Sequence, residues 1–168
     1  DIRSEQLTWS EEVYRIFGVA GKTALTLDDF VARIHPEDRE RVLAEWQAAL
    51  RGKPYDNEHR ILVGDAIRWV RERAHIRFDD AGQPLSAVGT VQDVTERHLA
   101  EEQLRKLLAR IIALEGYEVA EAADCAGGLR MLRRYEPDVV LCDVKLPDGN
   151  GVEMVERIKQ AMPSAEVI

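Results

Sequence analysis

The stretch Val139-Val140-Leu141-Cys142-Asp143, followed by Val144-Lys145-Leu146-Pro147-Asp148-Gly149-Asn150-Gly151, joins an apolar run to one aspartate and a Pro/Gly turn. A short apolar run bounded by turn residues is typical of a buried strand. Asp143 would then stand at the carboxyl end of that strand, which is where open α/β sheets bind their ligands. The sequence therefore predicts a site at Asp143 on an α/β sheet.

The residues around this stretch extend the same pattern. Residues 116–168 are predicted to alternate strand and helix as β-α-β-α-β, which is typical of a parallel sheet. The expected strands lie at residues 117–119, 139–143 and 165–168, and the expected helices lie at residues 129–134 and 151–159.

Composition narrows the class of protein. The 168 residues carry a net charge of -8, with 45% hydrophobic and 32% charged residues. The acidic balance argues against a nucleic-acid or anionic-membrane partner. No apolar run approaches the roughly 20 residues of a membrane span. Cys125 and Cys142 have neither metal-site nor disulfide spacing, so we expect a cytoplasmic protein. Because the chain begins at Asp1 rather than Met, we expect it to be part of something longer.

Residues 1 to about 95 predict a different kind of fold, α+β. Ser10 can cap a short helix that Gly18 ends, and Thr26 or Asp28 can cap a second helix. The expected helices are residues 11–17, 29–34 and 37–50, and the expected strands are residues 55–62, 67–78 and 85–94. Residues 67–78 alternate so that one face is apolar and the other carries arginines. We therefore predict a small antiparallel sheet with helices on one side.

Several motifs in this first segment occur together and in order. They are Trp9-Ser10-Glu11-Glu12, Ile34-His35-Pro36-Glu37-Asp38, Arg68-Trp69-Val70, Gly82-Gln83-Pro84 and Gly89-Thr90-Val91-Gln92-Asp93-Val94-Thr95-Glu96-Arg97. With these motifs the segment resembles a PAS sensor domain with its C-terminal PAC part, over residues 1–97. The resemblance implies a signal-input module. Its ligand is unknown; Phe30, Trp46 and Trp69 could line a pocket, or side chains could fill the core instead.

Residues 98–115 are predicted to form a linking helix that merges into the next domain. An apolar residue recurs with 4-3-4-3 spacing, as in a short coiled coil. The positions are Ala100, Leu104, Leu107, Ile111 and Leu114. This stripe either pairs two copies into a homodimer, as PAS exit helices commonly do, or packs on the helix's own domain.

From about residue 107 the chain resembles a response-regulator receiver domain, an α/β flavodoxin-like fold of two-component signalling. The resemblance implies that a histidine kinase or phosphotransfer protein is the partner and that Asp143 is the phospho-acceptor. It also implies Mg²⁺ at the site, held by Asp143 and by the backbone carbonyl of Lys145. Oxygen ligands in near-octahedral geometry are what Mg²⁺ requires.

The resemblance is incomplete, because the family's acidic pair at the end of strand one has no counterpart before the receiver-like helix. Asp28-Asp29 is expected at a PAS helix, Asp79-Asp80 in a hairpin turn and Glu101-Glu102 on the linking helix. The family's hydroxyl residue and lysine would fall beyond Ile168. In the strand order 2-1-3-4-5, loss of strand one separates strand two from strand three. An internal deletion, an artificial fusion and residues missing from the printed sequence are all open explanations.

No other residue pattern predicts an enzyme. His35 before Pro36 is expected to serve a turn rather than to bind haem, and His98 lacks a kinase domain around it. A Gly-Asn-Cys-Arg-Phe flavin-adduct motif does not occur. The sequence predicts a PAS input module coupled to a receiver-like aspartate domain with impaired phosphotransfer. The alternative is a non-catalytic PAS interaction module with a silent receiver remnant.

Overall fold

The computed structural model describes residues 1–2, 4, 6–20, 25–146 and 149–168. The chain divides into two compact units, Asp1–Glu101 and Glu102–Ile168, which are described separately below. The expected turn at residues 147–148 lies outside the described residues. No described helix is both long and apolar enough to cross a membrane.

Three helices of the first unit begin at residues suited to capping. Ser10 accepts a hydrogen bond from the backbone of Val13 and starts α1 (Glu11–Ile16). Thr26 and Asp29 form a reciprocal capping box at the start of α2 (Leu27–Arg33). This helix therefore begins two residues before the predicted start, because Thr26 rather than Asp28 is the cap. Helix α3 (Pro36–Ala49) follows, with Pro36 in its first turn.

The predicted antiparallel sheet is confirmed as a three-stranded meander. Strands β3 (Tyr55–Val63), β4 (Ala66–Phe78) and β5 (Pro84–Asp93) pair in the order β3-β4-β5. Two further short strands, β1 (Gln6–Leu7) and β2 (Leu25–Thr26), pair antiparallel with each other. Neighbours in the chain are thus neighbours in the sheet, as short hairpin connections require.

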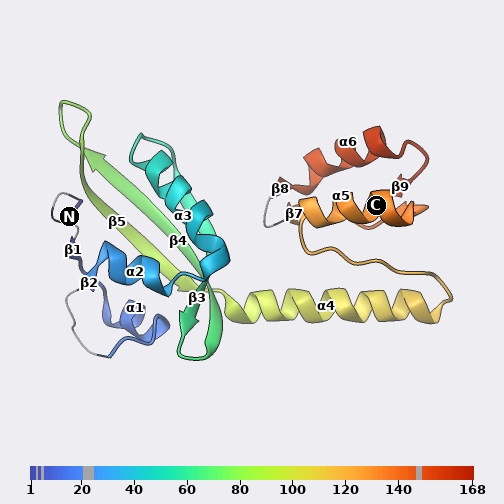
Figure 1. Cartoon of the computed structure of the whole chain (residues 1–168), viewed down its shortest axis with the longest axis horizontal. Helices are drawn as coiled ribbons and strands as arrows, with labels where there is room; N and C mark the ends of the chain where they lie inside the picture. The colour runs from blue at the N-terminus through green and yellow to red at the C-terminus, as the bar shows by residue number, and fades with distance from the viewer. Residues whose placement is uncertain (3, 5, 21–24, 147–148) are drawn as a thin grey trace. The chain divides into compact units, whose positions relative to one another are not determined.

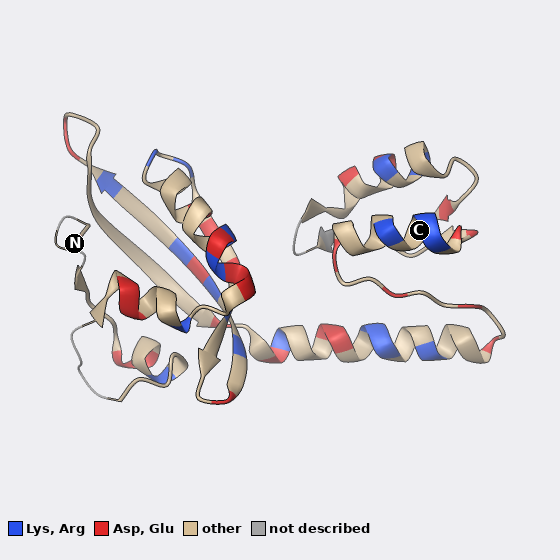
Figure 2. Cartoon of the chain, in the orientation of Figure 1, with Lys and Arg blue, Asp and Glu red and all other residues tan. Residues whose placement is uncertain are grey.

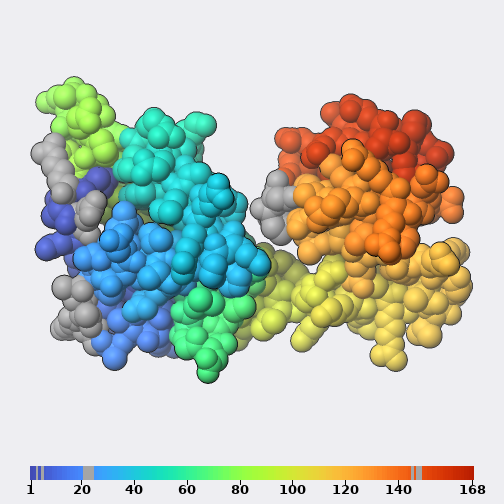
Figure 3. Space-filling model, in the orientation of Figure 1, coloured from blue at the N-terminus to red at the C-terminus, as the bar shows by residue number. Residues whose placement is uncertain are grey.

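The helices cover one face of this sheet (Figure 1). In the space-filling view α1, α2 and α3 hide most of the strands (Figure 3). Beneath them one cluster packs Ile16 and Phe17 against Ile61 and Val70. Gly18 ends α1 with φ +63, and a Cβ there would stand 2.4 Å from the Val63 side chain, so this position requires glycine.

The linking helix is confirmed as α4, which runs unbroken from Thr95 to Leu114. Basic and acidic residues alternate along it (Figure 2). Four of its predicted seam residues are strongly exposed: Leu104, Leu107, Ile111 and Leu114 have exposed fractions of 66%, 54%, 49% and 77%. No residue of α4 is buried in the structure.

In the second unit two amphipathic helices pack together. They are α5 (Cys125–Tyr135), capped by Asp124, and α6 (Gly151–Ala161), capped by Asn150. Parallel strands β6 (Val139–Val140) and β9 (Glu166–Val167) pair beside them, and β7 (Lys145–Leu146) pairs with β8 (Gly149–Asn150) as a hairpin. Leu132, Met154 and Ile158 form the buried core. Helix α5 begins four residues before the predicted start, because Asp124 caps it.

One predicted strand is wrong: residues 117–119 form neither helix nor strand. Tyr117 and Val119 have exposed fractions of 69% and 40%. The physical reason is the missing neighbour. Because α4 continues to Leu114, nothing directly before this segment supplies the strand on which strand two would pair. A strand without a partner leaves its backbone groups to water.

Candidate functional site

Asp143 is exposed and lies three residues after the end of β6, so the strand is shorter than the predicted residues 139–143. The strand is held on one side only: the Cys142 amide donates to the Ile168 carbonyl at 2.9 Å, and the Ile168 amide donates to Val140 at 2.9 Å. Gly151 passes so close that a Cβ there would stand 1.9 Å from the Asp143 carbonyl oxygen. The first residue of α6, next to Asp143, must therefore be glycine.

The described residues around Asp143 do not assemble the acidic cluster that the receiver resemblance implies for magnesium. No group of three or more His, Cys, Asp and Glu residues that could hold a metal is found in the described part of the chain. Lys145 lies in β7, where it pairs with Asn150. Of the ligands that the resemblance implies, Asp143 supplies one carboxylate and Lys145 one backbone carbonyl, and Mg²⁺ usually completes such a set with water.

The three acidic pairs occupy three different places in the chain. Asp28 and Asp29 are in the first turn of α2, where hydrogen bonds with the Thr26 backbone and hydroxyl lower the pKa of Asp29. Asp79 follows β4 and accepts backbone hydrogen bonds from Ala81 and Gln83 in the hairpin turn. The third pair, residues 101–102, is on α4. These positions agree with the places predicted for them.

The three aromatic residues proposed for a sensor pocket do not come together. The Phe30 ring lies 5.9 Å from Phe17, in the core beneath α1. Trp46 packs on Tyr55 at 5.3 Å, in a second core cluster. Trp69 stacks on His98 of α4 at 4.0 Å. In the β4 register Trp69 shares its face with exposed Arg73 and not with buried Val70, so it is on the opposite side of the sheet from the other two.

The inner face of the sheet carries a buried polar row instead. Tyr55, Asn57 and His59 alternate along β3 and are 7%, 6% and 0% exposed, and Glu72 stands opposite Asn57 on β4 at 9%. The Tyr55 hydroxyl donates to Glu72 at 3.4 Å. His59 Nδ1 and Asn57 Oδ1 are 2.9 Å apart. These four residues, hereafter the inner polar row, form a chain of polar groups under the helices.

Burial changes the protonation of this row. It raises the pKa of Glu72 to about 7, because the Tyr55 hydrogen bond only partly offsets the cost of burying the charged form. It lowers the pKa of His59 to about 4, with a further lowering from the Arg41 charge. It also raises the pKa of Tyr55. Near neutral pH, His59 is therefore neutral and the Glu72 carboxyl is poised between its two forms.

The outer face holds charged groups where the sheet meets the start of α4. Arg71 forms paired hydrogen bonds with Asp56 at 2.8 Å each. Glu58 accepts from Arg97 and faces His98 Nε2 at 3.0 Å. Burial opposes ionisation of Glu58, but the bonds to Arg97 and His98 outweigh it and lower its pKa. These contacts attach the first turns of α4 to β3.

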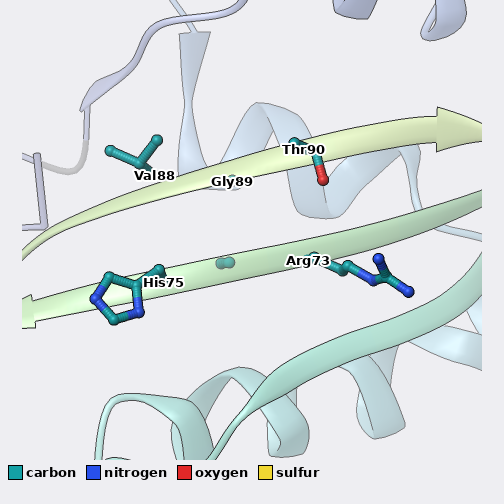
Figure 4. Close-up of a pocket in the computed structure, with 6 residues that line it drawn as sticks. Arg73, His75, Val88, Gly89 and Thr90 are labelled. Carbon is teal, nitrogen blue, oxygen red and sulfur yellow. The ribbon is translucent and has the colours of Figure 1, made fainter.

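A shallow depression also opens on this outer face, between cross-strand residue pairs of β4 and β5 (Figure 4). Its volume is about 310 Å³. It is lined by Arg73, Ala74, His75, Val88, Gly89 and Thr90. It is an open hollow on the sheet and not the enclosed aromatic pocket that the sequence suggested.

Comparison with known proteins identifies the two units. A family model described as the PAS fold matches residues 6–91, just over half of the chain. The chain belongs to the PAS-fold family. A second family model, the response regulator receiver domain, matches residues 100–168. The predicted order of a PAS domain followed by a receiver domain is thus confirmed. The PAS match ends within β5, before α4 begins, and the receiver match starts within α4.

Curated relatives are signalling proteins. Sensor protein FixL of Bradyrhizobium diazoefficiens is 31% identical over 107 residues, covering 62% of this chain and 21% of that protein. The blue-light-activated histidine kinase of Brucella ovis is 35% identical over 112 residues, covering 66% of this chain and 22% of that protein. The chain therefore spans about a fifth of the length of these relatives.

Solved structures agree on the fold. The sensory box histidine kinase/response regulator from Burkholderia thailandensis has a TM-score of 0.56 and 29% identity, covering 66% of this chain and 85% of that chain. The N-terminal domain of a diguanylate cyclase with PAS/PAC sensor from Marinobacter aquaeolei has a TM-score of 0.53 at 22% identity, over 58% of this chain and 93% of that one. The second likeness bears on the fold alone.

The inner polar row was missed by sequence reasoning, although its signal was present. Tyr55, Asn57, His59 and Ile61 occupy alternate positions, and the residues between them are charged or exposed. The alternation predicts one shared face but does not say that polar members of that face are buried. Glu72 lies on the buried face although it stands between two arginines, and a glutamate in such a setting is more often found on the solvent side of a sheet.

Proposed function

We propose that the chain is the sensory and regulatory part of a bacterial-type two-component phosphorelay. In this proposal the PAS unit receives a signal and α4 carries it onward. The receiver unit docks a histidine kinase or phosphotransfer protein. The observation that supports this is the succession of a PAS match and a receiver match in one chain, with α4 following the first match and containing the start of the second.

In the same proposal the receiver accepts a phosphoryl group poorly or not at all. Phosphoryl transfer needs a cation to neutralise charge that develops between donor and acceptor. Asp143 stands without a carboxylate cluster among the described residues, which supports a weak site. The domain limits that we propose are PAS at 1–97, linker at 98–115 and partial receiver at 116–168.

Phosphorylation of the isolated chain tests this proposal. The protein is incubated with MgCl₂ and acetyl phosphate, and its intact mass is measured, with Asp143→Asn as the matched control. We expect less than one phosphoryl group per chain, and no difference between the two proteins. Stoichiometric phosphorylation that Asp143→Asn abolishes would show instead that the receiver is active.

A second candidate is a PAS interaction module that works as a homodimer with a silent receiver remnant. The exposed leucine stripe of α4 favours it, since such a stripe on a helix is a coiled-coil seam. We expect Leu107→Glu with Ile111→Glu to reduce the mass measured by light scattering from dimer to monomer. Glu101→Lys, elsewhere on α4, serves as the control. A monomeric parent chain would exclude this candidate.

The signal itself is a separate question from the architecture. One relative is named as activated by blue light. We do not extend that property to this chain, because its sequence has no Gly-Asn-Cys-Arg-Phe flavin-adduct motif.

A further inference from the structure

One face of the short parallel sheet in the receiver unit is uncovered. Alternate residues of a strand point to opposite faces. Val140 and Cys142 pack against the core that α5 and α6 form. On the other face, Val139 and Leu141 are 53% and 50% exposed. Because parallel sheets are normally covered on both faces, this second face, hereafter the open sheet face, is an apolar surface that lacks its cover.

The same unit also presents an uncovered apolar helix surface. In the second half of α4, Leu104, Leu107, Leu108 and Ile111 have exposed fractions of 66%, 54%, 45% and 49%. A coiled-coil seam uses two positions in each heptad, whereas a helix that packs on a broad core presents a wider stripe. A seam between two helices would leave Leu108 uncovered, but a sheet face can cover the whole stripe.

The charges beside the two surfaces are complementary. Residues 103–114 of α4 include Arg105, Lys106 and Arg110 and no acidic residue. The first two form ion pairs with an acidic residue of α4, and Arg110 has no ion pair among the described residues. On the sheet, exposed Glu166 stands beside Val139 in the neighbouring strand. Opposite charges at the edges of two apolar surfaces favour their association and fix its orientation.

Within one chain neither surface is covered, because the residues of both remain about half exposed. We propose that α4 of one chain packs on the open sheet face of a second copy, and that the second copy returns the contact. Residues 115–124, which join α4 to α5, contain neither helix nor strand, so they can serve as the hinge of such an exchange. The two-fold arrangement covers both apolar surfaces twice.

This inference goes beyond the proposed function, because it makes the receiver unit of a second copy the partner of α4. The second candidate function differs, since there α4 pairs with α4. The two arrangements make opposite predictions for a change on the open sheet face, which only the exchange buries.

Light scattering of the full chain and two variants tests the exchange. We expect a dimer for the parent chain, and a dimer affinity at least about tenfold weaker for Leu107→Glu and for Leu141→Arg. An equimolar mixture of the two variants should recover the dimer. In the mixed dimer one contact is native, and the other places the introduced carboxylate against the introduced guanidinium. Val152→Arg, at an exposed position of α6, is the control and should remain dimeric.

Three outcomes would overturn the proposal: a monomeric parent chain, a dimer that Leu141→Arg does not weaken, or a mixture that stays monomeric. The second outcome would favour pairing of α4 with α4. None of these measurements involves phosphotransfer, so the proposed relay function keeps its own test with acetyl phosphate.

The parent chain also allows a test that needs no variant. In a mixture of ¹³C-labelled and unlabelled chains, isotope-filtered nuclear Overhauser effects report only contacts between copies. We expect such effects between the methyl groups of Leu141 in one copy and those of Leu107 and Ile111 in the other. The same effects confined to a single copy would mean that α4 covers the sheet of its own chain, and would overturn the exchange.

Discussion

The PAS and receiver units are both built from helices beside a sheet, yet they differ in how their strands find partners. In the PAS unit, β3, β4 and β5 pair with their chain neighbours along nearly their whole length. In the receiver unit, β6 and β9 pair over two residues only, and Val139 and Leu141 remain about half exposed. An antiparallel meander supplies its own partners, whereas a parallel sheet depends on strands from elsewhere.

The difference between the two units also concerns the candidate site at Asp143. Asp143 is present with much of its flanking sequence, but a phospho-acceptor site is assembled from several strand ends at once. The receiver unit keeps an aspartate at this position, and no cluster of three or more possible metal ligands occurs among the residues that the structure describes. The PAS unit, in contrast, retains a closed core and the polar row within it.

The largest expected effect is on the free energy of unfolding of each unit, and its measurement shows whether the two units unfold independently. Ile61→Ala and Ile158→Ala each remove a fully buried side chain, at a cost of about 2–5 kcal/mol. Trp9, Trp46 and Trp69 are all in the PAS unit, so tryptophan fluorescence reports that unit alone. In urea, Ile61→Ala should shift the fluorescence transition and Ile158→Ala only the circular-dichroism one. Equal fluorescence shifts would mean that the units unfold as one.

The next effect concerns pH in the PAS core. In the folded state the pKa of Glu72 is raised from 4.5 to about 7. The stabilising contribution of the protonated carboxyl is therefore fully present below pH 4.5, and it is lost as the pH rises through 7. The loss is about 3 kcal/mol at most. Glu72→Gln cannot ionise, so it should be more stable than the parent chain at pH 8 and nearly equal at pH 4.5. Fluorescence-detected urea midpoints at both pH values measure this.

His59 provides the opposing case. Its pKa is lowered from 6.5 to about 4, so the folded state loses stability as pH falls from 6.5 towards 4. Between pH 4.5 and 6.5 the two residues therefore act in opposite directions, and the parent chain should show little net slope from them. In Glu72→Gln the stability should rise with pH across this window. A flat profile in that variant would contradict the assigned burial of His59.

Helix caps should give a smaller and matched effect in each unit. Thr26→Ala removes the capping box of α2, and Asp124→Ala removes the side chain that accepts from the Gly127 amide at the start of α5. Each should cost about 1 kcal/mol. The first should appear in tryptophan fluorescence and the second only in circular dichroism. Thr26→Ser, which keeps the hydroxyl, is the control and should be close to the parent chain.

The smallest effect is expected at the surface of the receiver unit. Arg105 bonds Glu102 on α4 and Glu121 in the segment that follows it. Because these side chains are partly exposed, Arg105→Gln should cost less than about 1 kcal/mol, and less still in high salt. Circular-dichroism melts at low and high salt measure it. A larger, salt-independent cost would mean that Glu121 holds the missing-strand segment in place.

Local chemistry explains why much of the fold could be predicted from the sequence. Ser10, Gly18 and Thr26 act on their own helix ends, and their roles need no information from distant residues. The hairpin strands follow from alternation and the turns between them. The position of Asp143 after an apolar run was likewise a local inference.

Distant contacts explain what could not be predicted. In β4, apolar Ile67 and Trp69 fall on the exposed face and Glu72 falls on the buried one, so residue type, unlike the alternation, would assign these residues to the wrong face. Residues 117–119 have a strand-like composition but lack a neighbour to pair with. The burial of Asn57 and His59 depends on how α2 and α3 pack over β3. No local pattern in the sequence specifies that packing.

The order of the PAS strands also has a consequence for synthesis of the chain. Every partner of β4 lies within a short stretch before or after it, so the sheet closes only short loops as it forms. Because domains generally fold as units from the N-terminal end during translation, the meander can be complete before residues 139–168 leave the ribosome. The nascent PAS unit would then be protected from aggregation while the half-paired receiver strands are still being made.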